Sequence, residues 1–198
     1  MAAGRRGRHH RGVTELPAIE PSPAARADAA ALAALELVPP ATAGEHARTL
    51  ALASLAAAAL IRSRAPSRCL GRALARHLAE RRASRHDADA LPARPTRDEV
   101  AALAGPIAAA VRAARRFPPP GPAAMRRAED WCRGRGDDRE DALAGLVCAT
   151  LHAAPWTGAE PGLVLSAALA RLPGPPRTGE AVLEDATGWA LREDDRAP

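Results

Sequence analysis

Two side chains with metal-binding and nucleophilic chemistry, Cys148 and His152, stand four residues apart. On a helix this spacing places both on one face, where a thiolate and an imidazole can hold a zinc ion or act as nucleophile and base. Cys132 is a candidate for a third ligand. A structural zinc site usually needs four ligands at closer spacings, and a buried cysteine behaves as a small hydrophobic residue. We therefore predict a core role for Cys148, with no bound metal and no cofactor.

A group of acidic residues precedes Cys148 in the chain and consists of Asp137, Asp138 and Asp141. Their spacing matches the DDxxD pattern and so resembles the all-α prenyl-diphosphate enzymes. The resemblance implies carboxylates that hold magnesium against a diphosphate. Those enzymes are much longer and enclose a large cavity, and carboxylates at this kind of position also cap helices. We predict that Asp137 or Asp138 caps a helix.

Arginines form a regular pattern between residues 67 and 85. One row of side chains repeats every four residues and is apolar, and it consists of Leu70, Leu74 and Leu78. The second row is cationic and consists of Arg68, Arg72 and Arg76, extended by Arg81, Arg82 and Arg85. At 100° per residue the two rows lie roughly 160° apart on a helix. The pattern predicts one buried face and one cationic face that binds DNA or another polyanion.

The charge of the chain is unevenly distributed, which leaves a second interpretation open. Formal net charge is +5, but residues 61–97 contain ten arginines and three acidic residues, whereas residues 137–198 contain five arginines and eleven acidic residues. Such asymmetry can attract a polyanion, or it can draw the two segments of the chain together. From the sequence we favour attraction within the chain.

The segment from Asp98 to Gly105, with Val111 six residues later, resembles the helix-turn-helix of TetR-type repressors. The resemblance implies a turn at Gly105 and a second helix that contacts DNA. That second helix would begin with an isoleucine and three alanines, none of which reads a base edge. The DNA contacts expected from it are therefore phosphate contacts, made by Arg112, Arg115 and Arg116.

Composition predicts an all-α fold built on alanine and leucine. The chain has one phenylalanine and three tryptophans, and it has no lysine, asparagine, glutamine or tyrosine, a bias that indicates a GC-rich genome. Residues that suit strands are scarce, whereas alanine, leucine, arginine and glutamate are good helix formers. We expect a small helical bundle in which Trp131, Trp156 and Trp189 fill the core.

Prolines mark most of the expected boundaries, because proline breaks helix interiors. We expect a disordered basic tail at residues 1–23, one helical half at 24–95, a second at 96–192 and a short tail at 193–198. The expected helices cover residues 24–38, 44–64, 67–85, 97–116, 122–132, 138–154, 161–172 and 179–192. The fourth should start at a capping box formed by Thr96 and Glu99 and should kink or split at Gly105. The sixth is the most clearly amphipathic.

These patterns favour a cytoplasmic, non-enzymatic binding protein with a regulatory role. The three cysteines are widely spaced, no secretory signal is evident, and the longest apolar stretch, 49–61, is too short to span a membrane. Phosphate-binding, nucleophile-elbow and zinc-protease motifs are also missing from the sequence. Three alternatives stay open: a helical module that pairs with a protein partner or with itself, an enzyme that uses residues among Asp137, Asp138, Asp141, Cys148 and His152, and a GC-rich reading frame that is not expressed as a folded protein.

Overall fold

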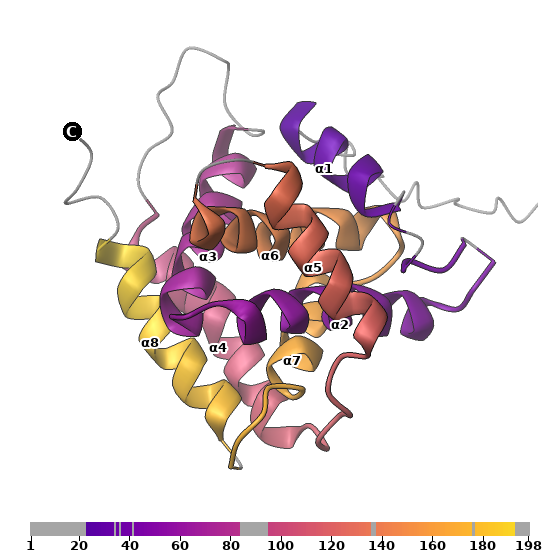
Figure 1. Ribbon diagram of the computed structural model, residues 1–198. Helices are drawn as coiled ribbons and strands as arrows, with labels where there is room; N and C mark the ends of the chain where they lie inside the picture. The colour runs from indigo at the N-terminus through magenta and orange to yellow at the C-terminus, as the bar shows by residue number, and fades with distance from the viewer. Residues whose placement is uncertain are drawn as a thin grey trace, which may run out of the picture.

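The computed structural model describes residues 23–33, 35, 37–40, 42–83, 95–135, 138–175 and 177–192. Within these residues the chain forms eight helices and no strand, so the predicted all-α bundle is confirmed. The helices are α1 (Pro23–Ala33), α2 (Glu45–Arg62), α3 (Pro66–Ala83), α4 (Arg97–Ala113), α5 (Pro122–Gly134), α6 (Arg139–Trp156), α7 (Pro161–Leu169) and α8 (Thr178–Arg192) (Figure 1). The two predicted tails lie outside the described residues, except that Pro23 begins α1.

Capping residues and prolines set several helix starts where the sequence predicted them. At the start of α4, the Thr96 hydroxyl accepts a hydrogen bond from the Glu99 backbone N–H, and the Glu99 carboxylate accepts from the Thr96 backbone N–H. Pro122 opens α5. Asp138 caps α6, since its Oδ1 accepts from the backbone N–H of Glu140 at 2.8 Å. The predicted capping box and the predicted aspartate cap are both confirmed.

Helix α4 continues through Gly105 and Pro106, so the predicted split into two helices at this point is wrong. A proline inside a helix removes the hydrogen bond to the carbonyl four residues earlier, here Ala102. Pro106 and Ala102 are both exposed, so water can satisfy that carbonyl and the helix persists. The expected turn at Gly105 is therefore wrong. Helix α1 also ends earlier than predicted, at Ala33.

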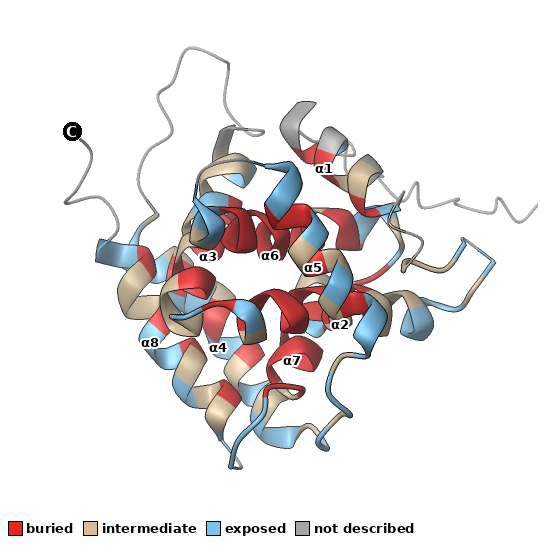
Figure 2. Cartoon of the chain, in the orientation of Figure 1, coloured by how far each residue is buried: buried red, intermediate tan, exposed pale blue. Residues whose placement is uncertain are grey.

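Helix α6 is the centre of the bundle and contacts α1, α2, α3, α5 and α7 (Figure 1). Every residue from Ala142 to Leu151 is buried, so the helix is covered on all sides (Figure 2). The prediction that it is amphipathic is wrong. Small residues such as Gly145 and Ala149, which the pattern assigned to the outer face, let neighbouring helices approach that face.

Leucines form the main core, and alanines form the closest helix contacts. The largest fully buried side chains in the described residues are all leucines. A separate small cluster joins alanines of α2, including Ala53 and Ala57, to Ala167 and Ala168 of α7. Trp131 is buried as predicted, but Trp156 is 53% exposed, so its predicted core role is wrong. Among the described helices, none has the length and apolar character needed to cross a bilayer.

Removal of the Glu99 carboxylate is expected to destabilise the protein in a pH-dependent way. The Arg82 guanidinium, together with the Thr96 backbone, lowers the pKa of Glu99 from 4.5 to about 2. Because the folded-state pKa is the lower one, the carboxylate stabilises the fold above about pH 4.5, and that contribution is lost as the pH falls toward 2. In urea denaturation, Glu99→Gln should be less stable than the parent at pH 7. The difference should shrink below pH 4.5, and a constant difference would contradict the assignment.

Candidate nucleic-acid interface

The predicted cationic row of α3 lies against carboxylates and an aromatic ring. The Arg68 guanidinium lies 5.6 Å from the centre of the Trp189 ring on α8. Arg72 Nη1 donates to Asp141 Oδ1 of α6 at 2.5 Å. Arg76 Nε donates to Glu80 Oε1 at 3.0 Å. Two of the three arginines in this row are thus partly neutralised within the chain.

Other contacts also join the basic middle of the chain to acidic residues. Arg76 lies 3.8 Å from Asp28 of α1, and Arg82 forms an ion pair with Glu99 of α4. The Ser67 hydroxyl lies 3.5 Å from Asp185 of α8. Of these contacts, Ser67–Asp185 joins the basic middle to the acidic last third, as Arg72–Asp141 does, whereas Asp28 and Glu99 lie outside that third. Arg85 lies outside the described residues.

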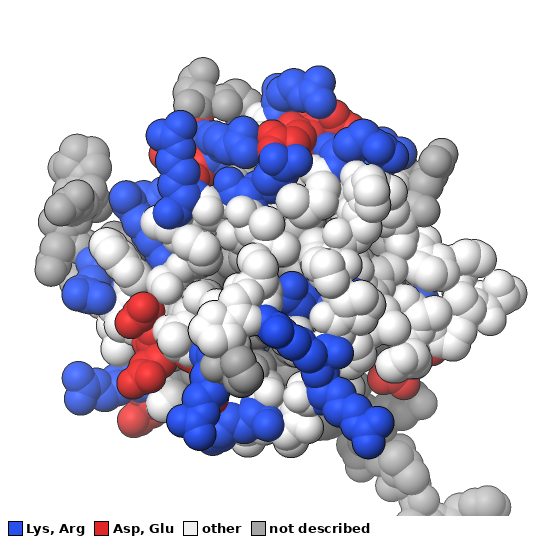
Figure 3. All heavy atoms as spheres, turned by 60° about the horizontal axis from the view of Figure 1, so that its bottom comes forward, with Lys and Arg blue, Asp and Glu red and all other residues white. Residues whose placement is uncertain are grey.

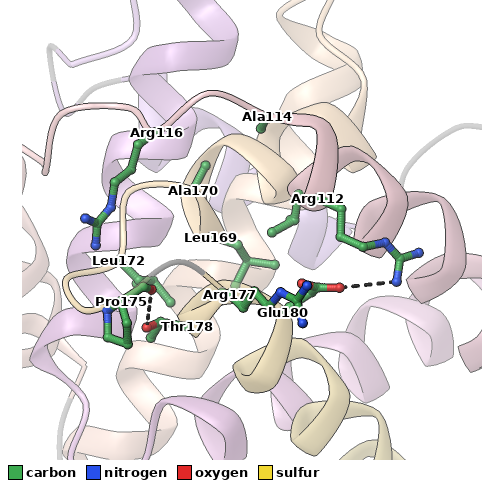
Figure 4. A pocket seen from close by; sticks show the side chains of 12 residues that line it. Arg112, Ala114, Arg116, Leu169, Ala170, Leu172, Pro175, Arg177, Thr178 and Glu180 are labelled. Atoms are coloured by element: carbon green, nitrogen blue, oxygen red, sulfur yellow. Dashed lines mark hydrogen bonds and ion pairs between the residues drawn. The ribbon is translucent and has the colours of Figure 1, made fainter.

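A second group of arginines lies at the C-terminal end of α4, around a hollow of about 450 Å³ (Figure 4). Arg112 from α4 and Arg116 from the following segment line this hollow, and Arg177 lines it from the turn between α7 and α8. Arg115, next to Arg116, is exposed. We call Arg112, Arg115, Arg116 and Arg177 the cationic rim. The apolar floor of the hollow includes Leu169 and Leu172.

The cationic rim has fewer acidic neighbours than the α3 row. Arg112, whose side chain is 61% exposed, donates to Glu180 at 3.2 Å, the pair drawn in Figure 4. Within the described residues, Arg115, Arg116 and Arg177 form no ion pair. Figure 3 brings this end of the molecule forward and shows basic side chains on both the upper and the lower parts of the face, with acidic side chains at the top, at the lower left and at the lower right. The rim therefore has a net positive charge.

Arg177 was missed by the sequence analysis and has an unusual backbone conformation. Its φ is 80°, in the left-handed region that non-glycine residues seldom adopt. Such conformations cost of order 1–3 kcal/mol and occur often at functional sites. The next residue, Thr178, stabilises the turn, because its hydroxyl donates to the Pro175 carbonyl at 2.9 Å. A lone arginine among prolines gave no periodic signal that could have identified it.

The structure changes the interpretation of the helix-turn-helix resemblance. Because α4 is continuous from Arg97 to Ala113, it has no turn that would separate a positioning helix from a recognition helix. Arg112 lies in its last turn, and Arg115 and Arg116 follow its end. The resemblance therefore does not extend to the fold, while the three arginines do lie together on an exposed surface.

The cysteine and histidine predicted to share a face do lie together. Cys148, His152 and Glu80 each have one potential ligand atom within 4.8 Å of the other two. Cys132, the third ligand considered from the sequence, is not part of this group. It lies on α5, with its Sγ 3.9 Å from the Arg139 carbonyl. The sequence analysis missed Glu80. It lies on α3 three residues after the buried His77, and therefore on the same side of that helix.

The acidic residues of the DDxxD pattern have other roles. Asp138 caps α6, and Asp141 pairs with Arg72, while Asp137 lies outside the described residues. Comparison of the chain with protein-family models, with curated proteins and with solved structures found no match.

Proposed function

We propose that the protein binds duplex DNA through the cationic rim, by contacts to phosphates rather than to bases, in a regulatory role. The observation that carries this proposal is that three exposed arginines from two separate segments, Arg112, Arg116 and Arg177, line one hollow with the exposed Arg115 next to Arg116, while Glu180 pairs with Arg112. Clustered arginines release counterions from DNA, and this supplies affinity without sequence recognition.

The choice of the rim over the α3 row follows from charge balance. Arg72 and Arg76 already have carboxylate partners, so binding DNA there would require those ion pairs to break. Arg115, Arg116 and Arg177 have no ion pair to break within the described residues. Arginine also suits this role because its planar guanidinium can donate two hydrogen bonds to one phosphate.

The geometry favours phosphate contacts over base recognition. The rim comes from a helix end and a turn, and neither presents a row of side chains along a helix that could enter the major groove. The exposed surface of α4 before the rim is made largely of alanines, such as Ala101, Ala102 and Ala109, which cannot hydrogen-bond base edges. Affinity should therefore vary little with DNA sequence.

A salt titration tests the proposal. Binding of the full chain to a random-sequence duplex should weaken linearly on a log–log plot of association constant against salt concentration. In the variant Arg115→Ala/Arg116→Ala/Arg177→Gly, the slope should decrease in magnitude by about 0.9 for each phosphate that the variant no longer neutralises. Glycine is used at position 177 because it adopts the left-handed conformation without steric cost.

The control replaces two exposed arginines that do not line the hollow, Arg64 and Arg133, with alanine. This variant has two fewer positive charges but should keep nearly the parent slope. A decrease of slope in proportion to the charges removed, three in the rim variant and two in the control, would mean that net charge, not the rim, determines binding. No binding of duplex at low salt would overturn the proposal.

A second candidate function is a helical protein-interaction module, and one observation favours it. Trp156 is more than half exposed and lines a groove of about 710 Å³ together with Leu103 and Ile107. Exposed tryptophans in apolar grooves are typical of binding surfaces. The same salt titration separates the candidates, because an interaction module of this kind has no reason to bind duplex DNA at low salt.

A further inference from the structure

Four side chains that can bind metal ions or carry protons lie between α3 and α6. Helix α3 provides His77 and Glu80, and α6 provides Cys148 and His152. We propose that Glu80, Cys148 and His152 bind one zinc ion, with its fourth position open toward the neighbouring groove. This site is separate from the cationic rim, which lies at the ends of α4 and α7.

The distances between the candidate ligands suit a single ion. One ligand atom of each residue lies within 4.8 Å of the other two, and His152 Nε2 is 2.8 Å from Glu80 Oε2. In tetrahedral zinc sites, bond lengths of about 2.0–2.3 Å place the ligand atoms about 3.3–3.8 Å apart. The His152–Glu80 pair must separate by about 0.5–1 Å, and a pair at the 4.8 Å limit must approach by about 1.0–1.5 Å.

The donor set selects the ion. A thiolate and an imidazole are ligands that zinc prefers, and a carboxylate is its third common protein ligand. Calcium and magnesium require oxygen ligands, of which this cluster offers one carboxylate. The negative charges of Cys148 and Glu80 would also balance the two positive charges of the ion. Neutrality is favourable here because Cys148 is buried, and burial of a net charge is costly.

His77 provides an independent observation that points to a ligand. Its side chain is 3% exposed, and neither ring nitrogen has a hydrogen-bond partner in the described part of the chain. Its ring centre is 4.6 Å from that of His152. Buried polar groups normally have partners, because an unpaired one costs about 1–3 kcal/mol. A water molecule on the open position of the ion would be a partner for His77.

Glu80 is already oriented for this role. Arg76 Nε donates to its Oε1 at 3.0 Å, which leaves Oε2 on the side of His152. Burial acts to raise the pKa of Glu80, but the contacts from His152 and Arg76 outweigh burial and lower that pKa. Protein groups that fix a ligating carboxylate in this way are a regular feature of metal sites.

The cluster lies beside a groove at the surface of the molecule. His77 and His152 line the groove that also contains Trp156, Pro106 and Leu103. Structural zinc sites are closed by four protein ligands, whereas sites with three ligands leave one position for water or a small molecule. The arrangement of three ligands beside a groove corresponds to the open type.

Cobalt(II) titration of the full chain tests the proposal, because cobalt occupies tetrahedral zinc sites and its thiolate complexes absorb in the near-ultraviolet. One equivalent of Co²⁺ should produce this absorption, and Zn²⁺ should displace it. Cys148→Ala should abolish the absorption and weaken Zn²⁺ binding by more than about 100-fold, beyond the effect typical of residues outside the ligand set. Cys69→Ala and Cys132→Ala are the matched controls, since both cysteines are also buried, and each should keep the absorption.

His77→Phe distinguishes a partner of the bound water from a ligand. It should keep the thiolate absorption but weaken Zn²⁺ binding by about 10- to 100-fold. Far-ultraviolet circular dichroism verifies that each variant folds. If Cys148→Ala does not fold, His152→Gln serves in its place, and it should weaken Zn²⁺ binding by a similar factor. No thiolate absorption with Co²⁺ in the parent, or absorption that persists in Cys148→Ala, would overturn the proposal.

Discussion

Replacement of Gly71 with valine is expected to destabilise the protein by about 3 kcal/mol or more, at the upper end of the usual cost of overpacking. Gly71 lies where α3 meets α8. A Cβ atom at this position would be 2.5 Å from the Trp189 Cβ and 2.9 Å from the Ala186 carbonyl oxygen. Since both are fixed to the backbone of α8, no side-chain rotation can relieve the contact. Valine adds two further methyl groups, so α3 and α8 must separate.

Alanine substitutions provide a sharper comparison for the same contact. In an exposed helix, Gly→Ala stabilises by about 1 kcal/mol. Gly105 of α4 is such a position, because a Cβ there would meet nothing within 4 Å. Urea denaturation followed by circular dichroism should show that Gly105→Ala is stabilising and Gly71→Ala is destabilising. If both variants are stabilised equally, α3 and α8 do not pack as described.

The helices could be predicted from the sequence because their ends depend on local chemistry. Thr96 and Glu99 form their capping box within four residues, and Pro122 opens α5 through its own fixed φ. Such signals do not require knowledge of the tertiary structure. The end of α1 was predicted less well, because no residue near Ala33 stops a helix and the next proline lies six residues away.

Burial of α6 could not be predicted from its pattern, because it depends on neighbours that are distant in sequence. Leu143, Leu146 and Leu151 indicated one apolar face correctly. Alanine, however, is compatible with both buried and exposed positions, so periodicity says little about Ala144 or Ala149. Both are buried because five other helices surround α6.

The candidate sites also divide into features that local sequence predicts and features that depend on residues distant in the chain. The α3 arginines were identified from their spacing, but their carboxylate partners come from other helices, as Asp141 does for Arg72. The sequence cannot place those partners. His77 did leave a signal that the analysis of the sequence did not use, because it lies three residues after Leu74 and thus on the buried side of α3. A polar side chain at a predicted core position is a reason to look for a partner.

Reversal of two rim charges is expected to have the largest effect on DNA binding. Arg115→Glu/Arg116→Glu leaves two phosphates without their arginines. With a slope of about 0.9 per phosphate, each contact raises the association constant about eightfold at 0.1 M salt relative to 1 M salt. The new carboxylates also repel phosphates. We therefore expect affinity to fall by roughly 100-fold or more at low salt. Both residues are exposed and follow the end of α4, so the free energy of unfolding should change little.

Arg72→Ala tests the α3 row in the same two assays. It should lower the stability of the protein and leave DNA binding almost unchanged. Arg72 is paired with Asp141, and its removal leaves that acidic residue without the arginine that joins α3 to α6. The variant should be less stable by a few tenths of a kcal/mol up to about 1 kcal/mol, as is usual for exposed ion pairs, and should bind DNA nearly as well as the parent. Binding by fluorescence anisotropy and stability by urea denaturation measure the two effects separately. If instead Arg72→Ala weakens binding while the double reversal leaves it intact, the α3 row is the binding surface, because its ion pairs with carboxylates then open when DNA binds.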